Sequence, residues 1–183
     1  MGLKMAFHPS TRVRYRKENT LDVQSFTYLT ELYQAISKPI VFTSYAGPDI
    51  DPQEANAIDV GNAAVSSSLL LIRFSNGCEV LCDADQLWGI HELINRVATT
   101  TVPIFTSPIN GFQYLRANRL MIGDKIKAIT QDGYITIASI EAYPVSFTQL
   151  YHARVPLFGN YYVVLSDVDN KDIDVVAGHQ TSY

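Results

Sequence analysis

The sequence has little of what marks membrane proteins and nucleic-acid-binding proteins. Its apolar runs, such as Leu69 to Ile72, are strand-sized and far below the roughly 18 residues that a membrane span needs. A net charge of −4 gives no electrostatic reason to expect a nucleic acid or a membrane as partner. With 47% apolar and 17% charged residues, the composition is that of a globular protein and excludes a disordered one.

Cysteine is also scarce, and the two present argue against a metal site. Cys78 and Cys82 lie four residues apart with no Cys or His partner at ligand spacing, so we expect no zinc and no other metal or cofactor. Side chains four apart on a strand point to the same side, which predicts two core thiols of a protein in a reducing cytoplasm.

The basic residues near the start alternate along a predicted strand. Arg12, Arg14 and Arg16, followed by Lys17, are typical of one solvated strand face rather than of a phosphate site.

Short β-branched and aromatic runs separated by turn signals dominate the remaining sequence and predict one mostly-β domain. Asn76-Gly77 and Asp132-Gly133 each separate two such runs and predict hairpins, because these dipeptides favour a turn with φ > 0. Apolar residues at helical spacing after Ser25 predict a helix that ends before Pro39. A second short helix is predicted over Ile90–Val97. The predicted strands are Arg12–Tyr15, Pro39–Thr43, Ala57–Val60, Leu69–Phe74, Glu79–Cys82, Lys125–Thr130, Tyr134–Tyr143, Tyr151–Val155 and Tyr161–Leu165.

Both ends of the chain resemble the splicing motifs of inteins. Residues 6–13, AFHPSTRV, resemble the opening motif, in which a Cys or Ser nucleophile leads into a strand headed by Thr-x-Val. Residues 175–181, VVAGHQT, resemble the closing motif of an apolar strand, a His, an Asn or Gln, and the first host residue. Three internal segments agree in order with the Hint-domain motifs: GCEVLCDADQ at 77–86, YLRANRLMIGDKI at 114–126, and LYHARV with FGNY between 150 and 161.

The resemblance implies an all-β Hint fold, shaped like a horseshoe, with one or two short helices. It implies a splicing domain over residues 6–180, with host (extein) stubs at 1–5 and 181–183. The interval 90–112 is too short for a homing endonuclease, so the chain is similar to a mini-intein. Inteins excise themselves in a single turnover and ligate their exteins without a cofactor. The implied partners are its own exteins, and a complementary half if the intein is naturally split, in a monomeric, cytoplasmic protein of a microbial or phage-encoded host.

Ala6 stands where the resemblance places the first nucleophile, and its methyl group has no lone pair with which to attack. Two explanations are open. Either a native Cys or Ser was replaced to trap the precursor, which we favour, or the chain resembles natural Ala-start inteins, in which the downstream nucleophile, here Thr181, attacks directly. The implied junctions are Met5–Ala6 and Gln180–Thr181.

In this chain Asp83 occupies the Thr position and Gln86 the His position of the family's Thr-x-x-His motif. Gln86 can donate a hydrogen bond to the first scissile carbonyl but cannot carry a proton near neutral pH. Our hypothesis gives part of that role to Asp83 or His8; the alternative is that these are ordinary polar residues at a strand end.

The later motifs carry the remaining predicted site residues. His152 replaces a family Asp and either relays a proton to Thr181 or is structural, whereas Asn160 is expected to order the backbone. His179 is expected to donate to the second scissile carbonyl while the side-chain nitrogen of Gln180 attacks it. Gln180 closes a six-membered glutarimide, more slowly than Asn would close a succinimide, because one more rotor is frozen.

Two alternatives to splicing remain in the sequence. A Hint autoprotease would cleave without ligating, although Thr181 after Gln180 argues against it. A non-catalytic β-rich binding module would leave His-Gln-Thr at the end of an apolar strand unexplained. A polar tail without function is the alternative for His179 and Gln180 alone.

Overall fold

The computed structural model describes residues 5–94, 104–106 and 111–179. Within these residues, antiparallel strands make up one sheet and there is one α-helix, α1 (Phe26–Ala35), with one short 3-10 helix, Ala117–Arg119. The strands are β1 (Arg12–Lys17), β2 (Thr20–Ser25), β3 (Val41–Ser44), β4 (Gln53–Asn56), β5 (Asp59–Phe74), β6 (Glu79–Cys82), β7 (Leu87–Glu92), β8 (Ile104–Thr106), β9 (Gln113–Arg116), β10 (Lys125–Lys127), β11 (Tyr134–Arg154), β12 (Asn160–Ser166) and β13 (Asp172–Gly178).

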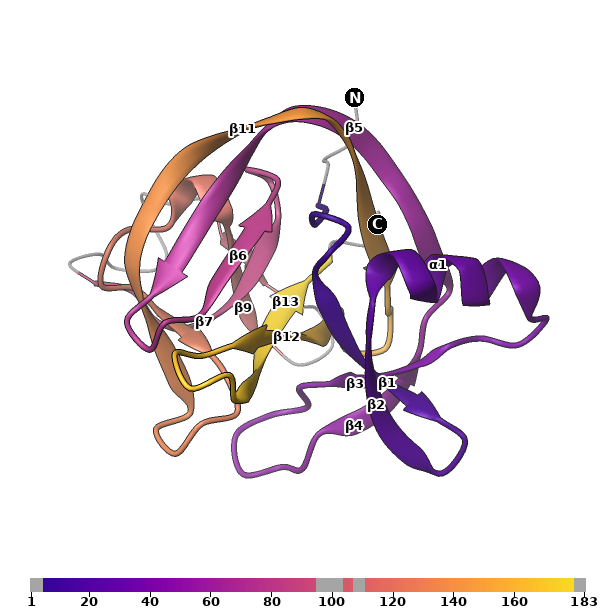
Figure 1. Cartoon of the computed structure of the whole chain (residues 1–183). Helices are drawn as coiled ribbons and strands as arrows, with labels where there is room; N and C mark the ends of the chain where they lie inside the picture. Colours follow the sequence, from indigo (N-terminus) through magenta and orange to yellow (C-terminus); the bar gives the residue numbers. More distant parts are fainter. Residues whose placement is uncertain (1–4, 95–103, 107–110, 180–183) are drawn as a thin grey trace.

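Two long strands hold the molecule together. β5 and β11 pair along their length and form a curved ribbon that arches over the rest of the chain (Figure 1). The ribbon joins one group of elements around β6, β7, β9 and β10 to another that contains α1 and β1–β4, with β12 and β13 between them (Figure 1). β11 shifts register at three places along β5, and such bulges bend a strand and increase its twist. The arch therefore passes over the described start of the chain at Met5 and the end of β13 (Figure 1).

The two predicted hairpins are confirmed, with a different turn geometry. In the β5–β6 hairpin Gly77 donates its N–H to the Phe74 carbonyl at 3.0 Å, and Phe74 donates to the Cys78 carbonyl at 2.8 Å. Gly77 has φ 90° and Asn76 is not left-handed, which describes a three-residue loop with glycine at the bulge position rather than a two-residue turn. Gly133 likewise has φ 82° between β10 and β11.

The first predicted helix is confirmed and the second is wrong where the structure describes it. Ser25 caps α1 by accepting a hydrogen bond from the Tyr28 N–H at 3.3 Å, and the helix ends before Pro39. Residues 90–92 belong instead to β7, whereas 95–97 lie outside the described residues. β7 pairs with β9, β10 and β13, and this pairing overrides the local helical spacing.

The strand predictions recover most of the sheet but divide its longest members. Tyr134–Tyr143 and most of Tyr151–Val155 are parts of the single strand β11, because the bulged stretch between them keeps pairs to β5 at Pro144, Thr148 and Gln149. Leu69–Phe74 is only the last third of β5. The pattern does not predict β2, β4, β7, β8 or β9, which are short or carry polar residues at exposed positions.

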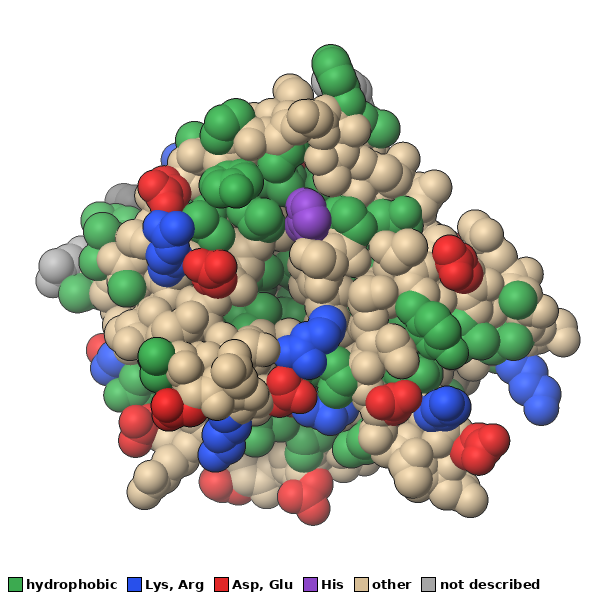
Figure 2. Space-filling model, in the orientation of Figure 1, with side chains coloured by type: hydrophobic (Ala, Val, Ile, Leu, Met, Phe, Trp, Pro, Cys, Tyr) green, Lys and Arg blue, Asp and Glu red, His purple; other side chains and the backbone are tan. Residues whose placement is uncertain are grey.

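The basic face of β1 is paired with acidic residues of β13, which lies beyond β12 in the sheet. Arg14 binds Asp174 through two hydrogen bonds of 2.9 and 2.7 Å, and Arg12 lies 2.9 Å from Asp172. On the face shown in Figure 2 the cations and carboxylates are likewise interspersed. No helix in the described part of the chain is long and apolar enough to cross a membrane.

Both cysteine side chains are fully buried in the main core, as predicted, although Cys78 lies just before β6 rather than on it. Burial raises the pKa of Cys78 from 9.0 to about 11, so the folded protein holds the thiol neutral at a pH where the unfolded chain ionises. The stability that this thiol contributes is therefore present below pH 9 and lost as the pH rises toward 11.

We expect the free energy of unfolding to fall by about 2 kcal/mol more between pH 8 and pH 10.5 in the parent than in Cys78→Ala. Urea denaturation at the two pH values measures this difference, and each protein serves as its own reference at pH 8. Equal losses in the two proteins would contradict the burial of an uncharged thiol at this position.

Candidate active site

The predicted opening junction lies on a short extended segment held between two strands. Phe7 exchanges both main-chain hydrogen bonds with Tyr151 of β11, at 2.8 and 3.0 Å. The carbonyl of Ala6 accepts from the N–H of Asp83 at 2.9 Å, and the main-chain N–H of His8 donates to the Leu81 carbonyl at 3.1 Å. Met5, Ala6 and Phe7 are all buried. The Met5–Ala6 peptide is therefore fixed from the chain just after it and from the turn that follows β6.

That turn, from Asp83 to Gln86, also reaches the other end of the domain. Gln86 donates its main-chain N–H to the Asp83 carbonyl at 3.1 Å, and Asp83 Oδ2 accepts from the Asp85 N–H at 3.0 Å. The side-chain amide of Gln86 donates to the carbonyls of Leu87, at 2.8 Å, and Gly178, at 2.9 Å. One turn thus binds the carbonyl of Ala6 and the carbonyl two residues before Gln180.

The direction of the Gln86 amide differs from the donation to the first scissile carbonyl that the sequence suggests. Both of its N–H bonds point to carbonyls on the closing side, where β7 pairs with β13. Its Oε1 is buried and has no hydrogen-bond partner among the described residues. The Gln86 amide therefore donates toward the closing motif, and its oxygen is a buried acceptor.

A pair of histidines lies at the closing side, and β11 contributes one of them. The rings of His152 and His179 have centroids 5.4 Å apart and meet edge to face at 71°. His179 donates its main-chain N–H to the Gly159 carbonyl at 3.0 Å. Because Tyr151 pairs with Phe7 and the next residue contacts His179, β11 joins the two ends of the domain a second time.

Asp59 is a site residue that the sequence did not reveal. Its Oδ2 lies 3.0 Å from Nε2 of His152, diagonally across the β5–β11 pair. A carboxylate at one ring nitrogen fixes the orientation and tautomer of a histidine. The two residues are 93 positions apart, and only the register of the ribbon brings them together.

Asn160 orders the backbone beside this site. Its Oδ1 accepts from the Tyr45 N–H at 2.7 Å, and its Nδ2 donates to the Tyr45 carbonyl at 3.0 Å and to the Tyr114 hydroxyl at 2.9 Å. The preceding Gly159 has φ 72°, a conformation that favours glycine and presents its carbonyl to His179.

His8 is engaged locally. Its Nδ1 lies 2.7 Å from the Ser10 hydroxyl and accepts from the Ser10 N–H at 3.2 Å, and partial burial lowers its pKa. An acceptor nitrogen and a lowered pKa both favour the neutral ring. Gln180 and Thr181, the other predicted site residues, lie outside the described residues.

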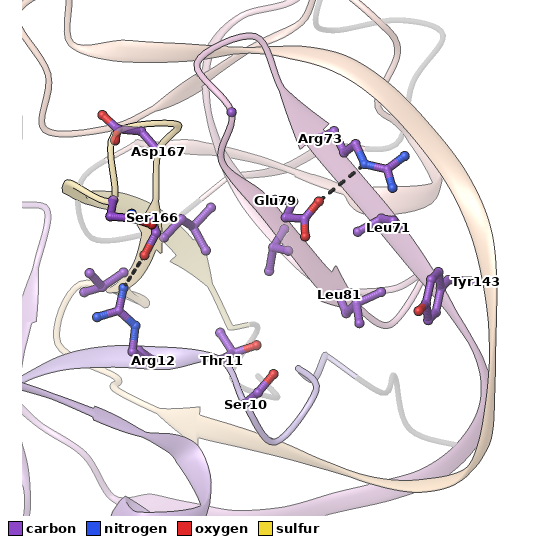
Figure 3. A pocket seen from close by; sticks show the side chains of 15 residues that line it. Ser10, Thr11, Arg12, Leu71, Arg73, Glu79, Leu81, Tyr143, Ser166 and Asp167 are labelled. Carbon is purple, nitrogen blue, oxygen red and sulfur yellow. Dashed lines mark hydrogen bonds and ion pairs between the residues drawn. The ribbon is translucent and has the colours of Figure 1, made fainter.

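A solvent-open groove between β6, β12 and the start of β1 borders the His8 contacts at Ser10 and Leu81 but is lined by none of the predicted site residues (Figure 3). It has a volume of about 470 Å³, and its two arginines are already paired. Arg12 donates to the Ser166 hydroxyl and to Asp172, and Arg73 pairs with Glu79 and Glu141. Cations neutralised in this way do not form an anion site.

Comparisons with solved structures give one consistent result. The chain is similar to an intein from a hyperthermophile, with a TM-score of 0.67 and 14% identity over 95% of this chain and 99% of that one. It is similar to a DnaB intein from Synechocystis sp. PCC 6803, with a TM-score of 0.65 and 13% identity over 96% and 99%. It is also similar to the TvoVMA intein, with a TM-score of 0.65 and 17% identity over 96% of this chain and 98% of that one. No protein-family model and no curated protein matches the sequence.

Proposed function

Since the chain has the Hint fold of the inteins over nearly its whole length, as its motifs predicted, we propose that residues 6–180 form a protein-splicing domain. Its substrates are its own flanking segments. The observation that carries the proposal is the Asp83–Gln86 turn, which binds Ala6 at one end and Gly178 at the other. Holding two reacting ends in one place converts a bimolecular acyl transfer into an intramolecular one, which removes most of its entropic barrier.

The proposed reaction begins with a Cys or Ser at position 6. Its sulfur or oxygen attacks the Met5 carbonyl carbon, the peptide C–N bond breaks, and the side-chain proton passes to the freed amine. The Thr181 hydroxyl then attacks this thioester or ester and releases the side chain of residue 6, which leaves a branched chain.

The closing steps use the two residues before Thr181. The side-chain nitrogen of Gln180 attacks the main-chain carbonyl carbon of the same residue. The amine of Thr181 leaves with a proton as the glutarimide forms. His179 donates to that carbonyl, and the ring of His152, oriented by Asp59, lies against His179. An acyl shift from oxygen to nitrogen then joins the exteins by a peptide bond.

Ala6 blocks this series of reactions at the first step. We therefore infer that Ala6 replaces a native Cys or Ser and holds the precursor unspliced. The chain acts as a monomer in the cytoplasm under this proposal. Direct attack of Thr181 on the Met5 carbonyl is the route that would operate if Ala6 were native.

The test places the Ala6→Cys chain between two large protein tags, with the Ala6 chain as the matched control. We expect ligated tags and a released domain from Ala6→Cys, and intact precursor from Ala6, read by mass spectrometry. Separated tags without ligation would indicate a Hint autoprotease, and an intact Ala6→Cys precursor would indicate a binding module. Ligation by the Ala6 control itself would assign the chain to the Ala-start route.

A further inference from the structure

The three side chains around the first proposed junction enter three different apolar clusters. Phe7 packs into the main core, with its ring stacked 5.6 Å from Phe26. Ala6 lies in a small cluster with Leu69 and Leu150. Met5 belongs to a third cluster and is only 3% exposed. The residue before the proposed scissile bond is therefore seated in a site of its own.

The third cluster, which we call the Met5 pocket, is lined by aliphatic and aromatic side chains. Its buried members besides Met5 are Leu87, Tyr114, Tyr162 and Val176, with Tyr45 and Phe112 packed against them. The Tyr45 and Phe112 rings lie 4.7 Å apart, and Lys127 Nζ lies over Tyr45 at 4.8 Å from its centroid. An apolar floor with aromatic walls accepts a large apolar side chain, and the Lys127 cation at the edge disfavours a second positive charge.

The walls of the Met5 pocket are fixed by other parts of the domain. Asn160 holds the Tyr114 hydroxyl and both main-chain polar groups of Tyr45. The ring of Tyr114 packs so closely on Gly178 that a Cβ there would meet Tyr114 Cδ1 at 2.7 Å. The pocket thus shares a wall with the backbone of the closing motif, and its shape does not depend on Met5 alone.

We propose that the Met5 pocket recognises the extein side chain that precedes the first scissile bond and selects a large, flexible apolar residue. The inference rests on the proposed function and names the class of host segment on which the domain acts. Methionine suits the site because its unbranched chain adapts to irregular walls and its sulfur contacts aromatic rings favourably. With the side chain seated on one side and Phe7 paired to Tyr151 on the other, the Met5 carbonyl between them is held for attack.

The test measures the first step alone, in a chain that carries Ala6→Cys and Gln180→Ala. Excess dithiothreitol cleaves the thioester at Met5, and the rate of that cleavage reports how well residue 5 is placed. We expect Met5→Leu to stay within about threefold of Met5 and Met5→Ser to be about 10- to 100-fold slower, the cost of losing a buried apolar side chain. Met5→Lys should be slower still, because burial and the neighbouring Lys127 both oppose a positive charge there. Met121→Ser, at a half-exposed methionine, is the matched control and should leave the rate unchanged.

A complementary pair separates recognition from general destabilisation. Met5→Trp is too large for the pocket and should react slowly, whereas adding Leu87→Ala should make room and recover at least tenfold of the rate; circular dichroism checks that both chains are folded. Equal rates for Met, Ser and Lys at position 5, or no recovery in the double variant, would overturn the pocket while leaving splicing intact. No cleavage in the Met5 parent would overturn both proposals.

Discussion

His179→Ala in the Ala6→Cys chain is expected to slow cleavage at Gln180–Thr181 by about 10²- to 10⁴-fold, the usual contribution of a positioned acid or base. His179 is the described residue next to that junction, and its ring is packed edge to face on His152 at 5.4 Å. Its main chain is anchored to Gly159 by a hydrogen bond that alanine keeps, so the substitution removes the imidazole without releasing the strand.

The same substitution should leave thioester formation at position 6 within a few-fold of its parent rate. Time courses of the two cleavage products, separated by mass, measure both steps in one sample. His91→Ala provides a matched control, because this exposed histidine of β7 packs on Tyr134 and belongs to neither proposed junction. An unchanged rate at Gln180–Thr181 in His179→Ala would contradict the proposed role, and the same loss in His91→Ala would make the effect nonspecific.

Trp88→Ala is expected to lower the free energy of unfolding by about 3–5 kcal/mol, the range measured for truncating large buried aromatic residues. Trp88 is fully buried on β7, and its ring meets that of Phe7 edge to face at 5.5 Å. It pairs in register with Ala177 of β13 and Leu115 of β9. The ring therefore supports the opening segment and the strand of the closing motif together.

Urea denaturation at 25 °C measures this loss. Phe147→Ala is the matched control, because the Phe147 ring is 85% exposed and its removal should change stability by less than about 0.5 kcal/mol. A loss below about 1 kcal/mol in Trp88→Ala would show that the core does not depend on this residue.

The elements that the sequence predicted well are those whose causes are local. Ser25 caps α1 through the nearby Tyr28 N–H, and Gly77 and Gly133 supply the positive φ that their hairpins need. Such signals act over a few residues, so a single sequence carries them in full. The helix predicted over Ile90–Val97 is wrong where it overlaps β7 for the opposite reason, since the three partner strands of β7 lie elsewhere in the chain.

By itself, the sequence determined the mostly-β class, the helix, the hairpins and the motif order that resembles a splicing domain. Only the tertiary structure decided that Gln86 binds Gly178, that Asp59 orients His152 and that Met5 occupies an apolar pocket. These contacts depend on the register of strands far apart in the chain, and register is set by the packing of the whole sheet rather than by any local preference. The side chain determines which chemistry a residue can carry out, and the fold determines which group that side chain contacts.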